Sequence, residues 1–388
     1  MNLFYSDKQK AFRKEVRKWL QANVPSTPLQ SLDTLVGFEQ HREWEKKLAE
    51  GNWGMVTWPK KYGGKDCNLI EWLIFEEEYY RAEAPLRVNQ NGVFLLGPTL
   101  MDYGTEKQKA RFIPGMASGD EIWAQAWSEP DAGSDMASIR TVGIRDGDEY
   151  VINGQKTWSS RAVFADWAFC LLRTEKGSKR HNGLSFVLVP LSADGVTVRP
   201  IRQLNGLPGF AEIFFDDVRV PVTNCVGQEG HGWQIAMATA GFERGLMLRS
   251  PARFQKAARR LVDLYRQKGD GITDSSLADS VMRCYLDAEA YALSTYQTAS
   301  KLMAGGRIGS EASCNKIFWS ELDLQIHYNA MTLLGARSEV VPEDDAMSTE
   351  LGTWLEDFVH SHSGPIYAGA NEIQRNIISE RVLGMPRS

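Results

Sequence analysis

The sequence lacks the features that mark membrane, secreted and nucleic-acid-binding proteins. No apolar run approaches the roughly 20 residues that a helix needs to cross a bilayer. The net charge of −5 gives no basic field that would attract DNA or RNA. The first residues show neither the apolar core of a signal peptide nor an Arg- and Ser-rich transit pattern. We therefore expect a soluble, cytoplasmic protein with no membrane and no nucleic acid among its partners.

Cysteine is also scarce, since the 388 residues include only five cysteines and no CxxC spacing. An odd number of cysteines without such spacing indicates a reducing compartment and neither a disulfide framework nor a zinc site. The chain does contain 43% hydrophobic and 24% charged residues, which is the balance of an ordinary globular protein. A chain of this length can bury a substantial core and hold two or three cooperating domains.

The hydrophobic spacing changes twice along the chain, and these changes divide it into three expected domains. Helical spacing predominates in residues 1–120, which predicts an N-terminal helical domain. In residues 121–230 the period becomes two, and apolar runs such as residues 184–190 predict the strands of a compact antiparallel β domain. Helical spacing returns in residues 231–388 and predicts a C-terminal bundle. The expected fold class is therefore α+β.

Two stretches of the β region have the composition of a binding site. The first reads QAWSEPDAGSD from Gln125 to Asp135, an apolar strand that breaks into a loop of proline, glycine and hydroxyl residues. Such a loop can approach a ligand closely, because Gly133 leaves room and both Ser128 and Ser134 supply hydrogen-bond donors.

The second stretch reads NGQKTWSS from Asn153 to Ser160. Its Asn153-Gly154 pair is a strong hairpin signal, and the strand that follows places Trp158 and Ser160 on one face. A flat aromatic ring with a hydroxyl two residues further on suits one wall of a planar heteroaromatic cofactor. Taken alone, the same pattern fits the edge of an ordinary β-barrel equally well.

Together these stretches resemble the two signatures of the acyl-CoA dehydrogenase family, a Glu-Pro loop with Gly-Ser-Asp and a strand of the form Asn-Gly-x-Lys-x-Trp. The stretch YAGANEIQRNII, which begins at Tyr367, resembles that family's C-terminal motif. The three motifs stand in the family's order and span the chain. The resemblance implies an N-terminal helical domain, a central antiparallel β-barrel and a C-terminal four-helix bundle, with FAD between the last two.

The family's reaction implies a carboxylate that removes the α-proton of an acyl-CoA thioester while the β-hydrogen leaves as hydride to flavin N5. In many members this base follows the tyrosine of the C-terminal motif, where the present chain has Ala368. Other members, such as the isovaleryl-CoA and long-chain enzymes, carry it in a Glu-Arg pair on the first helix of the bundle. Glu243 and Arg244 occupy that place here, so the resemblance implies Glu243 as the base and Arg244 as a residue that steadies the site.

The residues around Glu243 agree with this role, because they are apolar or small and would desolvate the carboxylate and raise its pKa. A plain helical ion pair with an arginine is the alternative. Gly241 and Gly245 flank Glu243 and could open space for an acyl group. Members with the base at this place take branched or bulky substrates, so the resemblance implies a bulky, branched or ring-bearing acyl-CoA.

The resemblance also assigns roles to the motifs themselves. The backbone N–H of Ala368 should donate to the thioester carbonyl, and Tyr367 and Gly369 should contact the substrate together with Arg244. The residues expected to line the flavin ring or its pyrophosphate are Gln125, Trp127, Ser128, Ser134, Trp158 and Ser160. Ser134 is alternatively a contact of the CoA phosphates.

Two further residues of the C-terminal motif are open to either of two roles. Gln374 and Arg375 could contact a ligand, or they could anchor the last helix through a buried salt bridge.

Two flavin-binding stretches of homotetrameric members, Arg-x-x-Phe-Gly and Gln-x-x-Gly-Gly, are not intact here. Residues 264–272 read LYRQKGDGI, and residues 331–337 read MTLLGAR. Either Arg266 or Arg337 substitutes from a shifted position, or a second acyl-CoA dehydrogenase-like chain supplies the contacts, as in the α2β2 steroid-degrading enzymes that this chain resembles most. We expect a homotetramer or an α2β2 tetramer that passes electrons to an electron-transfer flavoprotein.

Other functions on the same fold remain open from the sequence. They are an acyl-CoA oxidase, a desulfinase, and a non-catalytic or half-site subunit of a hetero-oligomeric dehydrogenase. The presence of both Glu243 and an intact Trp158 strand favours a catalytic chain.

Overall fold

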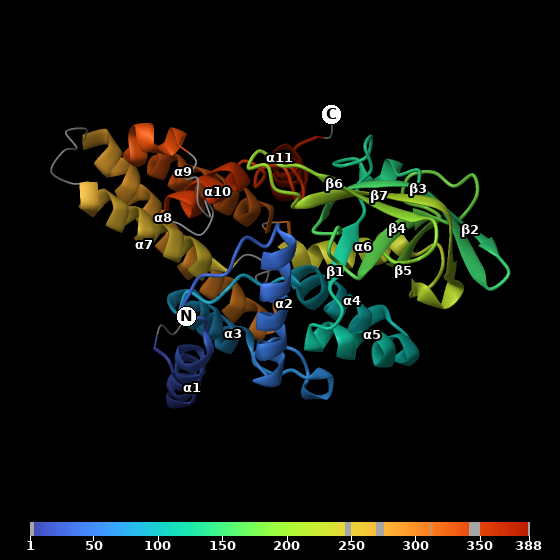
Figure 1. Ribbon diagram of the computed structural model, residues 1–388, viewed down its shortest axis with the longest axis horizontal. Coiled ribbons are helices and arrows are strands. Elements are labelled where there is room, and N and C mark those ends of the chain that lie inside the picture. Colours follow the sequence, from blue (N-terminus) through green and yellow to red (C-terminus); the bar gives the residue numbers. More distant parts are fainter. Residues whose placement is uncertain (1–3, 245–249, 269–274, 311, 341–349, 387–388) are drawn as a thin grey trace. The chain divides into compact units, whose positions relative to one another are not determined.

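A computed structural model describes residues 4–244, 250–268, 275–310, 312–340 and 350–386. The chain forms two compact units, each built from separate segments (Figure 1). The first, here called the helical unit, comprises Met1–Leu29, Cys67–Pro85 and Arg244–Ser388. The second, the sheet unit, comprises Gln30–Asp66 and Leu86–Glu243.

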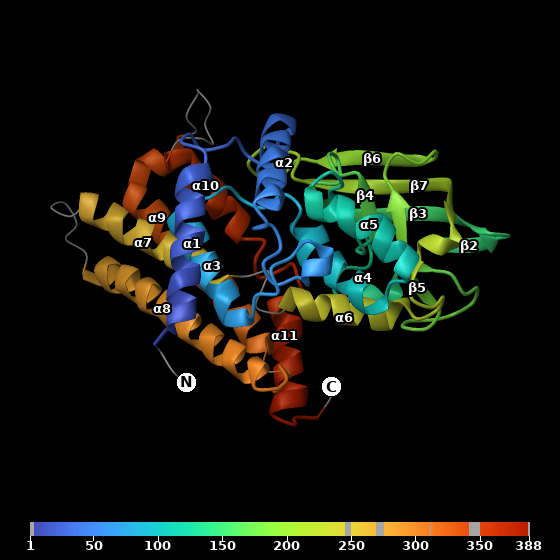
Figure 2. The same cartoon turned by 90° about the horizontal axis from the view of Figure 1, so that it is seen from below.

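The helical unit is built around three long helices, α7 (Pro251–Lys268), α8 (Ser275–Met303) and α9 (Ala312–Leu334), which lie side by side (Figure 2). Its other elements are α1 (Asp7–Asn23), α3 (Leu69–Arg81), the short 3₁₀ turn η6 (Gly335–Glu339), α10 (Glu350–Ser361), α11 (Asn371–Ile377) and the π turn η7 (Ile378–Val382). Large apolar side chains of α7, α9 and α10 fill its core, among them Phe254, Trp319 and Trp354.

The helices of the sheet unit are α2 (Leu35–Glu50), the short turn η1 (Lys60–Tyr62), the π turn η2 (Asn91–Leu96), α4 (Gly97–Tyr103), α5 (Glu106–Ser118) and α6 (Gly232–Arg244). Side-chain caps set where several helices begin. Thr105 accepts from the backbone N–H of Gln108, whose side chain in turn accepts from the N–H of Thr105. Such reciprocal bonds satisfy amides that the first turn of a helix leaves unpaired.

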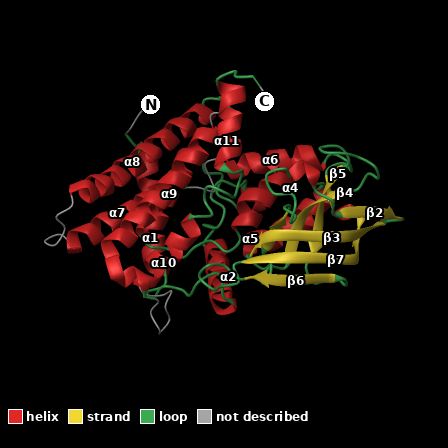
Figure 3. Cartoon of the chain, turned by 90° about the horizontal axis from the view of Figure 1, so that it is seen from above, coloured by secondary structure: helices red, strands yellow, loops and turns green. Residues whose placement is uncertain are grey.

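Eight strands form one sheet: β1 (Trp123–Ala126), β2 (Val142–Asp146), β3 (Glu149–Ser160), β4 (Trp167–Arg173), β5 (Leu184–Pro190), β6 (Val196–Ile201), β7 (Phe210–Pro221) and β8 (Cys225–Val226). Their hydrogen-bonded order is β6-β7-β3-β2-β4-β5-β8, with β1 beside β4. Figure 3 shows β2, β3, β7 and β6 as neighbours in this sheet.

The predicted α+β fold is confirmed, but the sheet differs in detail from the expected antiparallel barrel. Strand β4 pairs in parallel with both β1 and β2, so the sheet is mixed. Among the described strands, no pairing joins β6 to β8, so the hydrogen-bonded order is open at both ends. Strands β4 and β5 are buried along almost their whole length, as expected for strands covered on both faces.

The expectation of a hairpin turn at Asn153-Gly154 is wrong. The Asn153-Gly154 pair does not connect two strands but lies inside β3, at a shift of register against β7. Gly154 has a backbone φ of 145° there, which is unfavourable for any residue with a Cβ. The pair therefore forms a β-bulge, a feature that uses the same conformational freedom of glycine as a hairpin turn.

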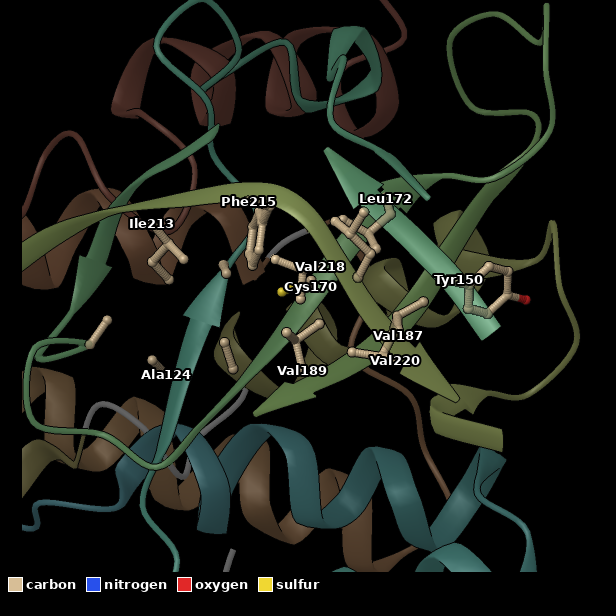
Figure 4. Packing of buried hydrophobic residues seen from close by; sticks show 14 of the residues in the cluster. Ala124, Tyr150, Cys170, Leu172, Val187, Val189, Ile213, Phe215, Val218 and Val220 are labelled. Carbon is tan, nitrogen blue, oxygen red and sulfur yellow. The ribbon is translucent and has the colours of Figure 1, made fainter. Parts of the chain in front are cut away.

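The core of the sheet unit consists of the inward side chains of these strands (Figure 4). The labelled residues, all buried, are Ala124, Tyr150, Cys170, Leu172, Val187, Val189, Ile213, Phe215, Val218 and Val220. This core fixes the strands that carry the two candidate binding stretches. Among the described residues, no helix has the length and apolarity needed to cross a membrane, and no group of three or more potential metal ligands gathers.

Candidate functional site

The two candidate binding stretches of the sheet unit are joined directly to each other. The backbone N–H of Thr157 donates to the carbonyl of Ser128 at 2.9 Å. The side chain of Lys156 reaches the same loop, and its Nζ donates to the carbonyl of Trp127 at 3.1 Å. Residues about 30 positions apart in sequence therefore form one continuous structure.

A buried ion pair lies at the centre of this structure. Lys156 is fully buried and its Nζ lies 2.8 Å from Oε1 of Glu129. The third Nζ donor goes to the carbonyl of Leu171 at 2.7 Å, so the ammonium group uses all three of its hydrogens. Glu129 also accepts from the backbone amides of Arg140 and Thr141, which closes the Glu-Pro loop on itself.

These contacts keep the pair ionised although it is buried. Burial opposes the charge of Glu129, but Lys156 and the two amide donors outweigh it and hold the pKa of the carboxyl below its ordinary value. Burial lowers the pKa of Lys156, and the attraction of Glu129 opposes that shift. Because every oxygen and hydrogen of the pair has a partner, we assign both groups as charged at neutral pH.

Trp158 is an exposed aromatic residue of the two joined stretches. Its backbone lies in the left-handed region with φ of 60°, at the second register shift of β3, and 60% of the residue is exposed. A non-glycine residue in this conformation is strained, and such strain concentrates at functional sites. The neighbouring Ser159 is fully buried, so the bulge turns the indole outward, where its ring meets that of Phe210 edge to face at 6.0 Å between ring centroids.

This arrangement fits a planar aromatic cofactor. The indole of Trp158 offers an open face, and the half-buried Ser160 and Ser128 carry hydroxyl groups on the two joined stretches. Gln125 is half-buried in β1, whereas Ser134 is exposed in the loop. A flavin ring could therefore meet an aromatic face and several polar groups here.

Trp127 lies differently from Trp158. It is buried, with its ring against Phe169 and Phe186 at 6.0 and 6.1 Å between centroids. Its indole Nε1 has no hydrogen-bond partner within the described part of the chain. In this structure Trp127 holds the loop through its packed ring and its carbonyl, which accepts from Lys156.

The candidate base Glu243 lies in the last turn of α6, and its backbone is helical. The side chains of Glu243 and Arg244 lie outside the described residues, as does Gly245. One turn earlier, the buried hydroxyl of Thr239 lies 2.8 Å from that of Thr99 in α4, which ties α6 to its neighbour. A Cβ added to Gly241 would meet no atom of the described part of the chain within 4 Å.

The C-terminal motif of the helical unit places Tyr367, Ala368 and Gly369 in the turn before α11. Ala368 has φ of 56° and Gly369 has φ of 87°, so two consecutive residues adopt left-handed backbone. The ring of Tyr367 packs on Trp319 at 5.9 Å between centroids. Strained backbone at Ala368 makes this turn a second candidate for function.

Gln374 and Arg375 take different positions on α11. Gln374 is fully buried, and its Nε2 donates to the carbonyl of Gly369 at 3.1 Å. Arg375 pairs with Glu321 at 2.6 Å, but each side chain is 53% exposed, so this is no buried salt bridge. Of the two residues, Gln374 is the one that supports the candidate turn.

Arg266 and Arg337, the expected substitutes for the altered flavin-binding stretches, lie at the ends of helices. Arg266 pairs weakly with Asp263 at 3.6 Å on the exposed surface of α7. Arg337 lies in η6, and the stretch from residue 269 to residue 272 lies outside the described residues.

The family models of the acyl-CoA dehydrogenases match almost the whole chain. The N-terminal domain model matches residues 6–120, the middle domain model residues 124–218 and the C-terminal domain model residues 230–383. The chain is 39% identical to the acyl-CoA dehydrogenase IpdE1 of Mycobacterium tuberculosis over 97% of both proteins. It is 31% identical to the acyl-CoA dehydrogenase FadE26 of the same organism over the full length of both.

Solved structures give the same result. The Tcur3481-Tcur3483 steroid ACAD superposes with a TM-score of 0.86 and 30% identity, and the ChsE4-ChsE5 complex from Mycobacterium tuberculosis with a TM-score of 0.83 and 30% identity. Both comparisons cover all of this chain and all of the matched one. The chain belongs to the acyl-CoA dehydrogenase family, whose members are flavoproteins that oxidise acyl-CoA thioesters.

Proposed function

We propose that this chain binds FAD and removes the α- and β-hydrogens of a bulky acyl-CoA thioester, with Glu243 as the base. The observation that carries the proposal is the joined structure of the sheet unit, in which a buried ion pair fixes the Glu-Pro loop to the strand that carries the exposed indole of Trp158. Ser128, Ser160 and Gln125 would complete this wall of the flavin site, and Ser134 would meet the pyrophosphate or the CoA phosphates.

Each catalytic role follows from the chemistry of the step. An α-proton is weakly acidic, so its removal needs a carboxylate of raised pKa and a donor to the carbonyl that gains charge. Glu243 would take the proton, and the backbone N–H of Ala368 would donate to the thioester oxygen. A backbone donor does not depend on the side chain, so an alanine at this position is compatible with activity. When bound, the flavin supplies an acceptor for the β-hydride.

Similarity supports a class of substrate. Two structural neighbours at 30% identity are described as a steroid ACAD and the ChsE4-ChsE5 complex. We therefore propose a ring-bearing acyl-CoA, with Arg244, Tyr367 and Gly369 among its contacts and an electron-transfer flavoprotein as the acceptor.

We propose further that the working enzyme is an oligomer, either a homotetramer or an α2β2 tetramer with a second chain of the same family. Support comes from the two neighbours, each of which is named as a pair of chains, and from the altered stretches at residues 264–272 and 331–337. In the hetero-oligomer the second chain would supply the flavin contacts that these stretches lack.

The test of the base compares the wild type with Glu243→Gln, which removes the carboxylate but keeps the size of the side chain. Cyclohexanecarbonyl-CoA serves as a small ring-bearing substrate and octanoyl-CoA as a linear one, with an artificial electron acceptor and the enoyl-CoA product measured by mass spectrometry. Loss of a general base should lower kcat by about 10²–10⁴-fold. Glu39→Gln, on the exposed surface of α2, is the matched control and should leave kcat unchanged.

Three outcomes would each contradict a part of this proposal. A wild-type protein that holds flavin but forms no enoyl-CoA from either substrate would rule out the dehydrogenase activity as stated. A Glu243→Gln variant with wild-type kcat would assign the base to another residue. Preference for octanoyl-CoA over cyclohexanecarbonyl-CoA would leave the reaction in place and contradict the substrate class.

A further inference from the structure

The turn that carries Ala368 needs support from its surroundings, because its backbone is unfavourable. Left-handed φ values at Ala368 and Gly369 follow each other directly, and an alanine avoids this region because of its Cβ. Such a conformation persists only where neighbouring groups determine it. The contacts that hold this turn therefore also set the direction of the Ala368 N–H.

A buried lysine of α9 holds both ends of the turn. The Nζ of Lys316 donates to the carbonyl of Gly364 at 2.7 Å and to Oδ1 of Asn371 at 2.8 Å. Both Lys316 and Asn371 are 3% exposed. Gly364 stands before the turn and Asn371 begins α11 after it, so one ammonium group links the entry and the exit of the segment.

Further hydrogen bonds connect these two ends to the strained residues. The N–H of Asn371 donates to the carbonyl of Pro365 at 2.8 Å, and Ser320 of α9 donates to Oδ1 of Asn371 at 3.2 Å. From the following turn of α11, the buried Gln374 holds the carbonyl of Gly369. The segment from Gly364 to Gln374 is therefore anchored before, within and after Ala368.

We infer that Lys316, acting through Asn371, is a positioning residue for the Ala368 backbone amide. The inference rests on the proposed function, in which this N–H donates to the thioester carbonyl. Stabilisation of a developing negative charge depends on donors that already point at it, and a displacement of about 1 Å can cost about 10²-fold in rate. Removal of the ammonium group frees both ends of the turn and lets Ala368 relax toward ordinary backbone.

The test uses Lys316→Met, which keeps the length of the side chain without its charge, in the full-length flavin-loaded protein. Lys18→Met, on the exposed surface of α1, is the control. Two quantities are measured for each protein. One is the separate change of kcat and KM with cyclohexanecarbonyl-CoA. The other is the infrared carbonyl band of bound 1-cyclohexenecarbonyl-CoA labelled with ¹³C at the thioester carbon, which moves to lower frequency when the oxygen accepts a hydrogen bond.

We expect Lys316→Met to lower kcat by about 10–10²-fold with KM within about threefold of wild type, and to return the carbonyl band toward its position in the free ligand. Asn371→Ala should behave in the same way, and it replaces Lys316→Met if that variant does not fold. Asn371→Asp should restore most of the activity and the band, because its carboxylate still accepts from Lys316. Lys18→Met should match the wild type in both measurements.

The two claims fail in different ways. If the wild type forms product and shifts the band while Lys316→Met keeps the wild-type band, the positioning role is overturned, even if the variant is less stable or less active. If the wild type itself neither forms product nor shifts the band, the proposed function is overturned and the inference with it. A crystal structure of Lys316→Met with Ala368 still at a left-handed φ would also contradict the positioning role.

Discussion

Two buried lysines, Lys156 and Lys316, hold parts of the two candidate sites in place through their hydrogen bonds. Lys156 lies among apolar strands, yet it has three oxygen partners, two from Trp127 and Glu129 and one from Leu171 of β4. The lysine two residues before Trp158 therefore fixes the Glu-Pro loop from a buried position, and the indole of Trp158 remains exposed.

Replacement of Lys156 by methionine is therefore expected to be severe. The change leaves the buried carboxylate of Glu129 without its cation, and loss of one partner of a buried pair costs about 3–5 kcal/mol. The free energy of unfolding is measured by urea denaturation, followed by tryptophan fluorescence. The control, Lys46→Met, removes an exposed ion pair with Glu43 and should change the free energy of unfolding by less than about 1 kcal/mol. If the two variants change the free energy of unfolding equally, the buried pair stabilises the fold no more than the exposed pair does.

The same pair predicts a dependence of stability on pH. The pKa of Glu129 is lower in the folded than in the unfolded chain, so its charge stabilises the fold at pH values above its unfolded pKa of about 4.3. This contribution is lost as the pH falls through the lower, folded pKa. Thermal unfolding of wild type and Glu129→Gln should differ clearly at pH 7, and the difference should shrink in acid. If the difference in unfolding temperature between the two proteins stays constant down to pH 3, the ionised state assigned to Glu129 is contradicted.

At the scale of single residues, sequence patterns indicated which stretches to compare but not the internal partners of their residues. The strand spacing placed Trp158 and Ser160 together, and the exposure of Trp158 agrees with a binding role. The pattern gave no sign that Trp127 packs inward or that Lys156 and Glu129 pair. Those contacts join residues far apart in the chain, so they depend on strand order, which spacing alone does not reveal. Polar residues flank both buried lysines, Gln155 and Thr157 around Lys156 and Asn315 before Lys316, so the local sequence gave no signal of their burial.

Among the elements, an apolar run was predicted closely and irregular features were not. The strand expected at residues 184–190 is β5, with the same bounds. The Asn153-Gly154 pair was expected as a hairpin turn and is a bulge, because glycine serves both structures and the local sequence does not distinguish them. The parallel pairing of β4 with β1 and β2 was also not predicted, since periodicity carries no information on strand direction.

The bulge in β3 gives a prediction at this scale. A Cβ at Gly154 would lie 2.6 Å from the side-chain oxygen of Thr141, and the φ of 145° disfavours any side chain. Gly154→Ala should destabilise the protein by about 1–3 kcal/mol and reduce flavin content, because Trp158 follows in the same strand. Gly54→Ala is the control, since a Cβ there would make only ordinary contacts, the nearest at 3.7 Å, and Gly54 lies outside the two candidate binding stretches. Thermal unfolding and flavin absorbance measure both effects, and equal behaviour of the two variants would contradict the role of the bulge.

For the whole molecule, the exposed apolar side chains of α8 bear on assembly. Met282, Leu286 and Leu293 are each at least half exposed and recur at helical spacing, which places them on one stripe. Exposed stripes of this kind mark sites of association. We expect the proposed oligomer to cover this stripe.

Leu286→Glu should therefore lower the native mass measured by light scattering, because a charge would be buried at the contact. Gln21→Glu introduces the same change of charge at an exposed position of α1 and should leave the mass unchanged. A Leu286→Glu variant with the native mass of the wild type would place the subunit contact elsewhere.

The most direct test of the central claim is anaerobic reduction of the bound flavin. The purified protein is mixed with cyclohexanecarbonyl-CoA without oxygen, and the flavin absorbance band is followed in the wild type and in Glu243→Gln. The account predicts bleaching of the band in the wild type and a rate about 10²–10⁴-fold lower in the variant, with the flavin still bound. Bleaching at the same rate in both proteins, or none in a flavin-loaded wild type, would contradict it.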